Sequence, residues 1–333
     1  MTHDPTPLRP QHHRVPHPVP RVVVHPACSG APVEEVMSNE RPMGLILGMP
    51  FESYHAVDAM SASGMRELAR SPWHYRNRVQ INPTRAMLSG TLAHCAVLEP
   101  NALFERYRVV PSGAPKRPTQ AQWQAKDPSE SSKAAMAWWT QFQQDCGKRE
   151  IVSAEDFAVT KAQLLALEQN RELAEMLAHG DSEVSLFWID PDTGVYCKAR
   201  PDHIPPRRAG RRQMLDLKAM ADDSPEGFKR SVARMGYHRQ RAHYRRGFEV
   251  VTGERVDDFV FAVVSAAPPV LASAYRLVDD ACQQGEDEVR ELLEEYARCC
   301  AADHWPAYSP EQRMIDLPVW AKASGELEVE IVQ

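Results

Sequence analysis

Two aspartates and a lysine stand in two short segments that could together hold a metal ion. Asp202 follows Arg200 and Pro201, and Asp216 and Lys218 lie in the next apolar segment. The residues between them, 205–210, contain prolines and a glycine, which indicate a turn. We therefore expect strands over 195–204 and 213–218 to lie side by side and bring Asp216 next to Asp202. Asp216 and Lys218 then project from the same face, because strand side chains alternate.

This arrangement suits the chemistry of phosphate esters. Mg²⁺ prefers carboxylate oxygens, keeps several waters and binds phosphate oxygens at its remaining positions. Lys218 could orient the attacking water, or accept its proton, and offset charge on a pentavalent phosphate. Alone, an Asp-x-Lys sequence also fits an ion pair at a strand end.

A predicted helix over 225–248 adds two polar side chains. Gln240 and Tyr244 stand four residues apart and so face the same side. Toward the metal strands they could bond the DNA backbone or the surroundings of Lys218. The alternative is a half-buried polar pair that packs against the sheet.

Together these segments resemble the PD-(D/E)xK nuclease superfamily, and specifically the exonuclease VIII (RecE-type) exodeoxyribonucleases of phages and prophages. The resemblance runs from about Tyr54 to Trp320. It is carried by Tyr54-His55, Met60 to Met65, Ser71 to Tyr75, Gly90 to His94, Leu98 to Pro100, Glu183 to Trp188, Asp192 to Gly194, Lys198 to Asp202 and Tyr237 to Tyr244.

The resemblance implies the fold and the site residues. The fold would be α/β, a restriction-endonuclease-like PD-(D/E)xK core with a mixed central sheet flanked by helices and with added N-terminal helices. The implied catalytic residues are Lys218, Asp216, Asp202, His94, Gln240 and Tyr244. The implied metal ligands are Asp202, Asp216, the Leu217 carbonyl, His94 and Glu183.

Two of these roles stay open. His94 would contact a second metal or its water, and a neutral imidazole suits Mn²⁺ better than Mg²⁺. The alternative for His94 is an ordinary helix histidine. Glu183 either reaches the metal through water or only starts a strand.

The resemblance also implies an activity and its partners. The protein would be a Mg²⁺-dependent exodeoxyribonuclease, with Mn²⁺ as a substitute, that degrades one strand of linear duplex DNA 5′→3′. It would release 5′-mononucleotides and leave a 3′ single strand for annealing recombination. The implied partners are double-stranded DNA ends, a single-strand annealing protein and further copies of the chain in a tetrameric ring.

Two alternatives remain. One is a single-strand exonuclease of the Cas4 or RecB type. The other is a non-catalytic DNA-binding protein on the same fold, which the carboxylates argue against, because binding alone needs only basic residues.

The charge distribution favours a polyanionic substrate although the whole chain has a net charge of −6. Residues 196–250 carry fourteen basic and six acidic side chains, a balance of +8 that leaves −14 for the rest. Arginine contacts to phosphate supply affinity that is independent of sequence. The predicted DNA-binding residues are Arg200, Arg239, Arg241 and Arg245, although the spacings of four among such arginines also fit a solvated helix face. His238 and His243 are expected to face DNA or solvent.

The cysteine pattern and the composition predict a cytoplasmic protein, and the resemblance implies the cell of a bacterium or a phage-infected host. With 333 residues, 43% of them hydrophobic, the chain can bury a substantial core. No apolar run of about 18 residues predicts a membrane span, and no secretory signal is expected. The seven cysteines have no metal-site spacing and are typical of reduced thiols.

The chain divides into three predicted regions. Residues 1–50 are rich in proline and histidine and predict a disordered N-terminal arm. Residues 51–325 would form the nuclease domain and 326–333 a C-terminal tail. Within the domain we expect a helical wall over 59–98 that bears His94, a short helix with Trp138 and Trp139, a strand over 258–265 and a last helix over 278–302.

Overall fold

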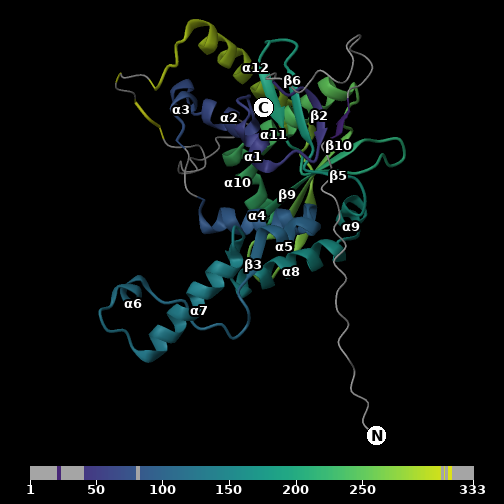
Figure 1. Ribbon diagram of the computed structural model, residues 1–333. Coiled ribbons are helices and arrows are strands. Elements are labelled where there is room, and N and C mark those ends of the chain that lie inside the picture. Colours follow the sequence, from purple (N-terminus) through teal and green to yellow (C-terminus); the bar gives the residue numbers. More distant parts are fainter. Residues whose placement is uncertain (1–20, 24–40, 80–82, 309–310, 312–313, 317–333) are drawn as a thin grey trace, which may run out of the picture.

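The computed structural model describes residues 21–23, 41–79, 83–308, 311 and 314–316, and it has an α/β architecture (Figure 1). One sheet has the order β1-β2-β6-β7 and is antiparallel. A second has the order β11-β10-β9-β8-β5 and is mixed, because β9 and β10 run parallel. The strands are β1 Arg21–Val23, β2 Gly44–Leu47, β5 Asp181–Ser182, β6 Ser185–Ile189, β7 Tyr196–Ala199, β8 His203–Ile204, β9 Gln213–Met220, β10 Asp258–Ser265 and β11 Ala272–Tyr275; β3 Tyr107–Val109 and β4 Glu150–Val152 form a separate parallel pair.

Helices cover both faces of the second sheet. The helices in the described part of the chain are α1 Phe51–Ala56, α2 Ala62–Leu68, α3 Pro72–Arg76, α4 Arg85–Leu98, α5 Leu103–Arg106, α6 Gln120–Gln124, α7 Glu130–Cys146, α8 Ala154–Gln169, α9 Arg171–Leu177, α10 Pro225–Met235, α11 Tyr237–Thr252 and α12 Asp279–Ala302, with a 3₁₀ turn, η1, over Pro100–Ala102. Helices α6 and α7 extend away from the body as an arm (Figure 1). Among the described residues, no helix is long and apolar enough to cross a membrane.

The side chains of β9 and β10 alternate between two apolar layers. On β10, Phe259, Phe261 and Val263 join the core cluster under α10 and α11, whereas Val260, Ala262 and Val264 pack with α8 and α9. On β9, Met214 belongs to the first layer and Leu215 and Leu217 to the second. Because strand side chains alternate, Asp216 and Lys218 face the side covered by α10 and α11.

A bent hairpin links the two sheets. The chain leaves the second sheet between β5 and β6 and returns to it between β7 and β8. The single strand predicted over 195–204 is therefore wrong: it breaks at residues 200–202, where Pro201 has no N–H to donate to a neighbour. Glu183 lies at the opposite bend with φ +54°, and its N–H donates to the Asp202 carbonyl at 2.9 Å. The bends thus hold Glu183 and Asp202 side by side.

The helix predicted over 225–248 is also wrong in its continuity, because α10 ends and α11 begins at Gly236. Gly236 has φ +72°, a left-handed conformation that glycine adopts at little cost, and its N–H donates to the Val232 carbonyl at 2.9 Å. Gln240 and Tyr244 remain together on α11. The break lets α11 start next to β9 with Tyr237 as its first residue.

The predicted boundary at residue 50 leaves out a strand of the fold. β2 pairs with β6 through Leu45 and Leu186, and β1 pairs with β2. Residues 1–20 and 24–40 of the predicted arm and the predicted tail over 326–333 lie outside the described residues. The strand over 258–265 is confirmed, the last helix begins at Asp279, and α7 is longer than the short helix expected there.

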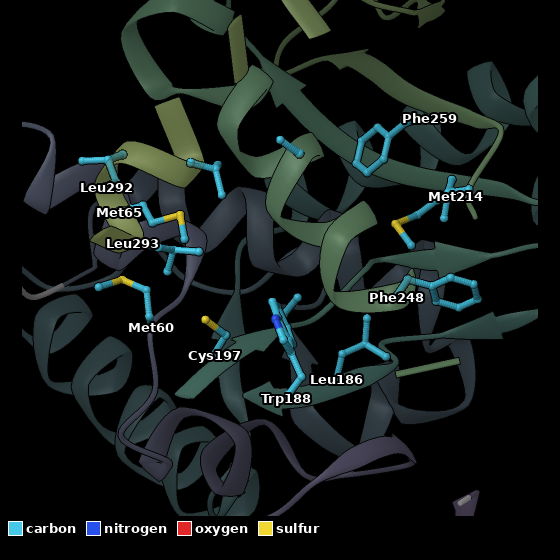
Figure 2. Packing of buried hydrophobic residues seen from close by; sticks show 14 of the residues in the cluster. Met60, Met65, Leu186, Trp188, Cys197, Met214, Phe248, Phe259, Leu292 and Leu293 are labelled. Carbon is cyan, nitrogen blue, oxygen red and sulfur yellow. The ribbon is translucent and has the colours of Figure 1, made fainter. Parts of the chain in front are cut away.

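The main core packs around Trp188 and joins β6, β7, β9 and β10 to α2, α11 and α12 (Figure 2). Helix α11 approaches Trp188 closely through Gly247. A Cβ atom at Gly247 would lie 2.5 Å from the indole ring. The glycine is therefore required by packing, since its φ is an ordinary helical one.

Gly247→Ala is expected to destabilise the protein by about 1–3 kcal/mol, because the buried indole cannot move without disturbing the core. Gly90→Ala on α4 is the matched control, since an added Cβ there meets nothing within 4 Å. The control should be neutral or stabilising by up to about 1 kcal/mol. Urea unfolding of both variants measures the difference, and equal stabilities would contradict the packing argument.

Candidate active site

Three side chains from distant parts of the chain converge on one point. The ligand atoms of His94 on α4, Glu183 and Asp202 all lie within 4.8 Å of one another. His94 Nδ1 is 3.6 Å from Asp202 Oδ2. One imidazole nitrogen and two carboxylates are a donor set that fits a divalent cation.

Asp216 joins this group from the centre of β9. The Leu217 N–H donates to Asp202 Oδ2 at 2.7 Å, which fixes Asp202 against the strand that carries Asp216. Gln240 Nε2 donates to Asp216 Oδ1 at 2.7 Å. Asp216 Oδ2 forms an ion pair with the Lys218 ammonium and has no hydrogen-bond partner among the described residues. A metal ion bound at this buried oxygen would therefore take the place of the Lys218 ammonium.

The electrostatics of the group favour a bound cation. Burial raises the pKa of Asp202 well above its usual value, and the nearby Asp216 carboxylate raises it further. For Lys218, burial alone would lower the pKa, but the carboxylates of Asp216 and Asp202 outweigh it and the pKa is raised. A divalent ion would stabilise the ionised carboxylates that burial destabilises.

His94 is held as a neutral imidazole. Burial, followed by the charge of Lys218, lowers its pKa to about 4. The ring also bonds the backbone of Leu217, which orients it on the strand. Neutral imidazole is the form that ligates a metal, so His94 fits that role at neutral pH.

Glu183 and Arg200 form a buried pair at the edge of the group. Arg200 Nε donates to Glu183 Oε2 at 2.5 Å, and both side chains are largely buried. Burial raises the pKa of Glu183 while the Arg200 charge opposes the rise. Arg200, predicted from the sequence to contact DNA, is therefore placed to hold a candidate metal ligand.

The other three predicted DNA-binding arginines point to α12. Arg239 bonds Glu288 at 3.0 Å, and Arg241 and Arg245 share Glu286 at 3.3 and 3.0 Å. They leave α11 on a different side from Gln240, which faces Asp216. A role for them in DNA binding stays a prediction, and the structure shows them joining two helices.

Tyr244 completes the polar layer above the carboxylates. It is half-buried, bonds Gln240, and has a pKa raised well above its usual value by loss of solvent contact and by the neighbouring Tyr54. Gln240 and Tyr244 thus contact the site as a pair, in the direction expected from their spacing.

His238 and His243 are buried, so the expectation that they face DNA or solvent is wrong. His238 Nε2 lies 3.0 Å from Glu288 Oε2. His243 Nε2 donates to the Lys198 carbonyl at 3.0 Å, and its ring lies 4.8 Å from that of Trp188. Both histidines belong to the packing of α11.

Tyr237 is a site residue that sequence reasoning missed. The Lys218 ammonium lies 4.7 Å from the centre of its ring. Lys218 is therefore held between Asp216 and an aromatic face, which attracts a cation. Tyr237 lies within the segment that resembles the family helix, but nothing in its spacing marks it.

Tyr237→Leu is expected to slow catalysis roughly 2- to 30-fold, because a cation–π contact is worth about 0.5–2 kcal/mol. Tyr237→Phe retains the ring and should keep nearly full activity. The measurement is kcat and KM for both variants with the same substrate. A Phe variant as slow as the Leu variant would assign the effect to the hydroxyl instead.

A groove of about 1060 Å³ opens above Lys218, Gln240 and Tyr244. Its walls come from α1, α2, α3 and the junction of α10 and α11. Six basic side chains line it against two acidic ones, a balance of +4 in an acidic chain. The basic ones are Arg66, Arg70, Arg78, Lys198, Arg200 and Lys218, and the acidic ones are Asp58 and Glu67.

The positive charge of residues 196–250 does not form one patch. Besides the arginines that reach α12, Arg207 and Arg212 pair with Glu254, Arg208 with Glu175, Arg230 with Asp222, and Arg246 with Asp190 and Asp192. Half of the groove's basic residues, Arg66, Arg70 and Arg78, come from before that segment. The local surplus at the groove therefore matters more than the charge of the segment.

The mixed sheet, the bent hairpin and the Asp202, Asp216 and Lys218 set define a protein of the PD-(D/E)xK class. The chain belongs to the family described as "PDDEXK-like domain of unknown function (DUF3799)", whose model matches residues 61–318.

A crystal structure from Eubacterium rectale, described as that of a "Putative exonuclease", is similar in fold. It is 15% identical, with a TM-score of 0.47, and the match covers 82% of this chain and 96% of that one. No protein matches in the comparison with curated proteins.

Proposed function

We propose that this protein is a divalent-metal-dependent exodeoxyribonuclease. The observation that carries the proposal is the cluster of His94, Glu183 and Asp202 next to the ion pair of Asp216 and Lys218, because Lys218 also lines the positively charged groove. Binding alone would need the basic lining but not buried carboxylates next to a lysine. Membership in the PDDEXK-like family supports the same conclusion.

Asp202, Asp216 and the Leu217 carbonyl would hold one metal, with His94 and Glu183 available for a second ion or its water. Mg²⁺ is the proposed ion and Mn²⁺ its substitute. When bound, the metal supplies Lewis-acid stabilisation of the phosphate oxygens. The protein's own groups do the rest: Gln240 fixes Asp216, Tyr237 positions Lys218, and Arg200 fixes Glu183.

Lys218 is the proposed group that meets the attacking water and the charge of the reacting phosphate. Its raised pKa means that Lys218 is protonated before the metal arrives. In that state it can donate hydrogen bonds and stabilise negative charge. With Asp216 serving as a metal ligand, Lys218 would no longer be held in its ion pair with Asp216 and could contact the attacking water.

The finer proposal is a RecE-type reaction. The enzyme would degrade one strand of linear duplex DNA 5′→3′ and release 5′-mononucleotides. Its product, a 3′ single strand, would pass to an annealing protein, and the enzyme would act as a ring-shaped tetramer in the cytoplasm. These features rest on the sequence segments described above.

The test compares linear and closed circular duplex DNA with metal-stripped protein and added Mg²⁺ or Mn²⁺. The proposal predicts that linear DNA is digested only after a metal is added, and that the circle stays intact. Digestion of the circle would show an endonuclease instead. Cleavage in the presence of excess chelator would contradict the metal centre.

A further inference from the structure

We propose that Trp73 forms a stacking subsite for one unpaired base of a DNA strand in the groove. This inference rests on the proposed function. It adds that the part of the DNA substrate in contact with Trp73 is single-stranded. Trp73 lines the same groove as Lys218 and is 48% exposed. A large aromatic surface left open in a basic groove is a feature of sites that bind single strands.

The backbone of Trp73 is well supported. Trp73 is in the first turn of α3, where its N–H donates to the Pro306 carbonyl at 3.0 Å. Helix α3 packs on α2, and α2 in turn packs on α11 and α12. The indole therefore extends into the groove from a supported element, so the main chain need not be ordered when a base stacks on it.

The surroundings of Trp73 suit a phosphate backbone. Arg66 and Arg70 share one carboxylate, Glu67, at 3.7 and 2.8 Å, and all three side chains line the groove. Arg78 lies 3.7 Å from the exposed Asp58 and also donates to the Tyr75 carbonyl at 3.0 Å. Ion pairs that are open to solvent on at least one side contribute little, so the guanidinium groups can exchange these carboxylates for phosphates.

The groove also limits what can reach Trp73. Its volume, about 1060 Å³, is near the upper end of the range for sites that hold a single drug-sized molecule. That space suits a few nucleotides of one strand and not a duplex of the same length. In a duplex the faces of the bases are already stacked, so a base must be unpaired to contact the indole.

The experiment measures binding of a labelled single strand of about ten nucleotides by fluorescence anisotropy. It uses the full chain with Lys218→Ala and Mg²⁺, so that the strand is not digested. Trp73→Ala should weaken binding roughly 5- to 150-fold, the range for loss of one stacked base. Trp123→Ala is the matched control, because Trp123 is 45% exposed on α6 and lies outside the groove.

A second experiment identifies the base that stacks on Trp73. Single abasic positions are moved along the strand. One position should weaken binding to the protein with Trp73, and the same position should have no effect once Trp73 is alanine. Trp73→Phe, which keeps an aromatic face, should recover part of the affinity and guards against a folding defect.

The proposal is overturned if Trp73→Ala weakens binding no more than Trp123→Ala. It is also overturned if the abasic scan gives the same profile with and without the indole, or if a blunt duplex binds as tightly with the same dependence on Trp73. Failure of the proposed function would appear separately, as absence of cleavage by the protein with Lys218 intact.

Discussion

Lys218→Ala is expected to lower the rate of DNA cleavage by about 10²- to 10³-fold or more, the range for loss of one preorganised charge-stabilising group. The ammonium is the cationic group that contacts Asp216, and Tyr237 holds it at the floor of the groove. Lys229→Ala is the control, since Lys229 is an exposed lysine on α10 that pairs with the exposed Glu226.

Asp216→Asn gives the same loss by a different route, because it removes a metal ligand. The amide keeps the size of the side chain, so Gln240 still has a partner. The two variants should differ in stability: Lys218→Ala leaves a buried carboxylate without its counterion, whereas Asp216→Asn removes that charge. Activity within a few-fold of the unmodified protein in either variant would contradict the site.

Protein stability should fall by about 3 kcal/mol between pH 6.5 and pH 4 because of His243 alone. Burial lowers the pKa of this imidazole to about 4, against about 6.5 in the unfolded chain. Above pH 6.5 the ring is neutral in both states and contributes nothing to the pH dependence. As the pH falls from 6.5 to 4, His243 binds a proton in the unfolded chain but stays neutral in the folded protein, so the free energy of unfolding decreases.

His243→Gln tests this sign. The amide is neutral at every pH and can still donate to the Lys198 carbonyl. The stability difference between the unmodified protein and this variant should therefore shift by about 3 kcal/mol between pH 7 and pH 4. His94 acts in the same direction, but its side chain is 30% exposed and solvent screens its share. A constant difference across that range would mean that His243 binds a proton as readily in the folded protein as in the unfolded chain.

The pairing of Asp202 with Asp216 follows from short-range signals, whereas the fold class was implied by the resemblance to the PD-(D/E)xK nucleases. Two apolar segments with a proline- and glycine-containing turn between them are enough to place these aspartates together. The bends at Glu183 and Asp202 cannot be predicted from such signals. They arise where the chain passes between two separate sheets, and the strands that pair in each sheet are far apart in sequence. Glu183 adopts a positive φ that nothing in its own residue type predicts.

The partners of the charged and polar side chains on α11 could not be predicted from the sequence either. Arg241 and Arg245 look like a basic helix face in the sequence, but Glu286, which neutralises them, lies on another helix. His243 looks like a polar residue of that face until Trp188 and the Lys198 carbonyl surround it. Periodicity shows which residues share a side of a helix. It does not show what that side meets.

The most direct test of the central claim is the fate of end labels on linear duplex DNA. Duplexes labelled at the 5′ or the 3′ end are incubated with the protein and Mg²⁺, beside the Lys218→Ala variant. The account predicts that the 5′ label is released first, as a mononucleotide, and that the variant releases none. If neither label is released and no strand is cut with Mg²⁺ or Mn²⁺, the carboxylate cluster is not a nuclease centre.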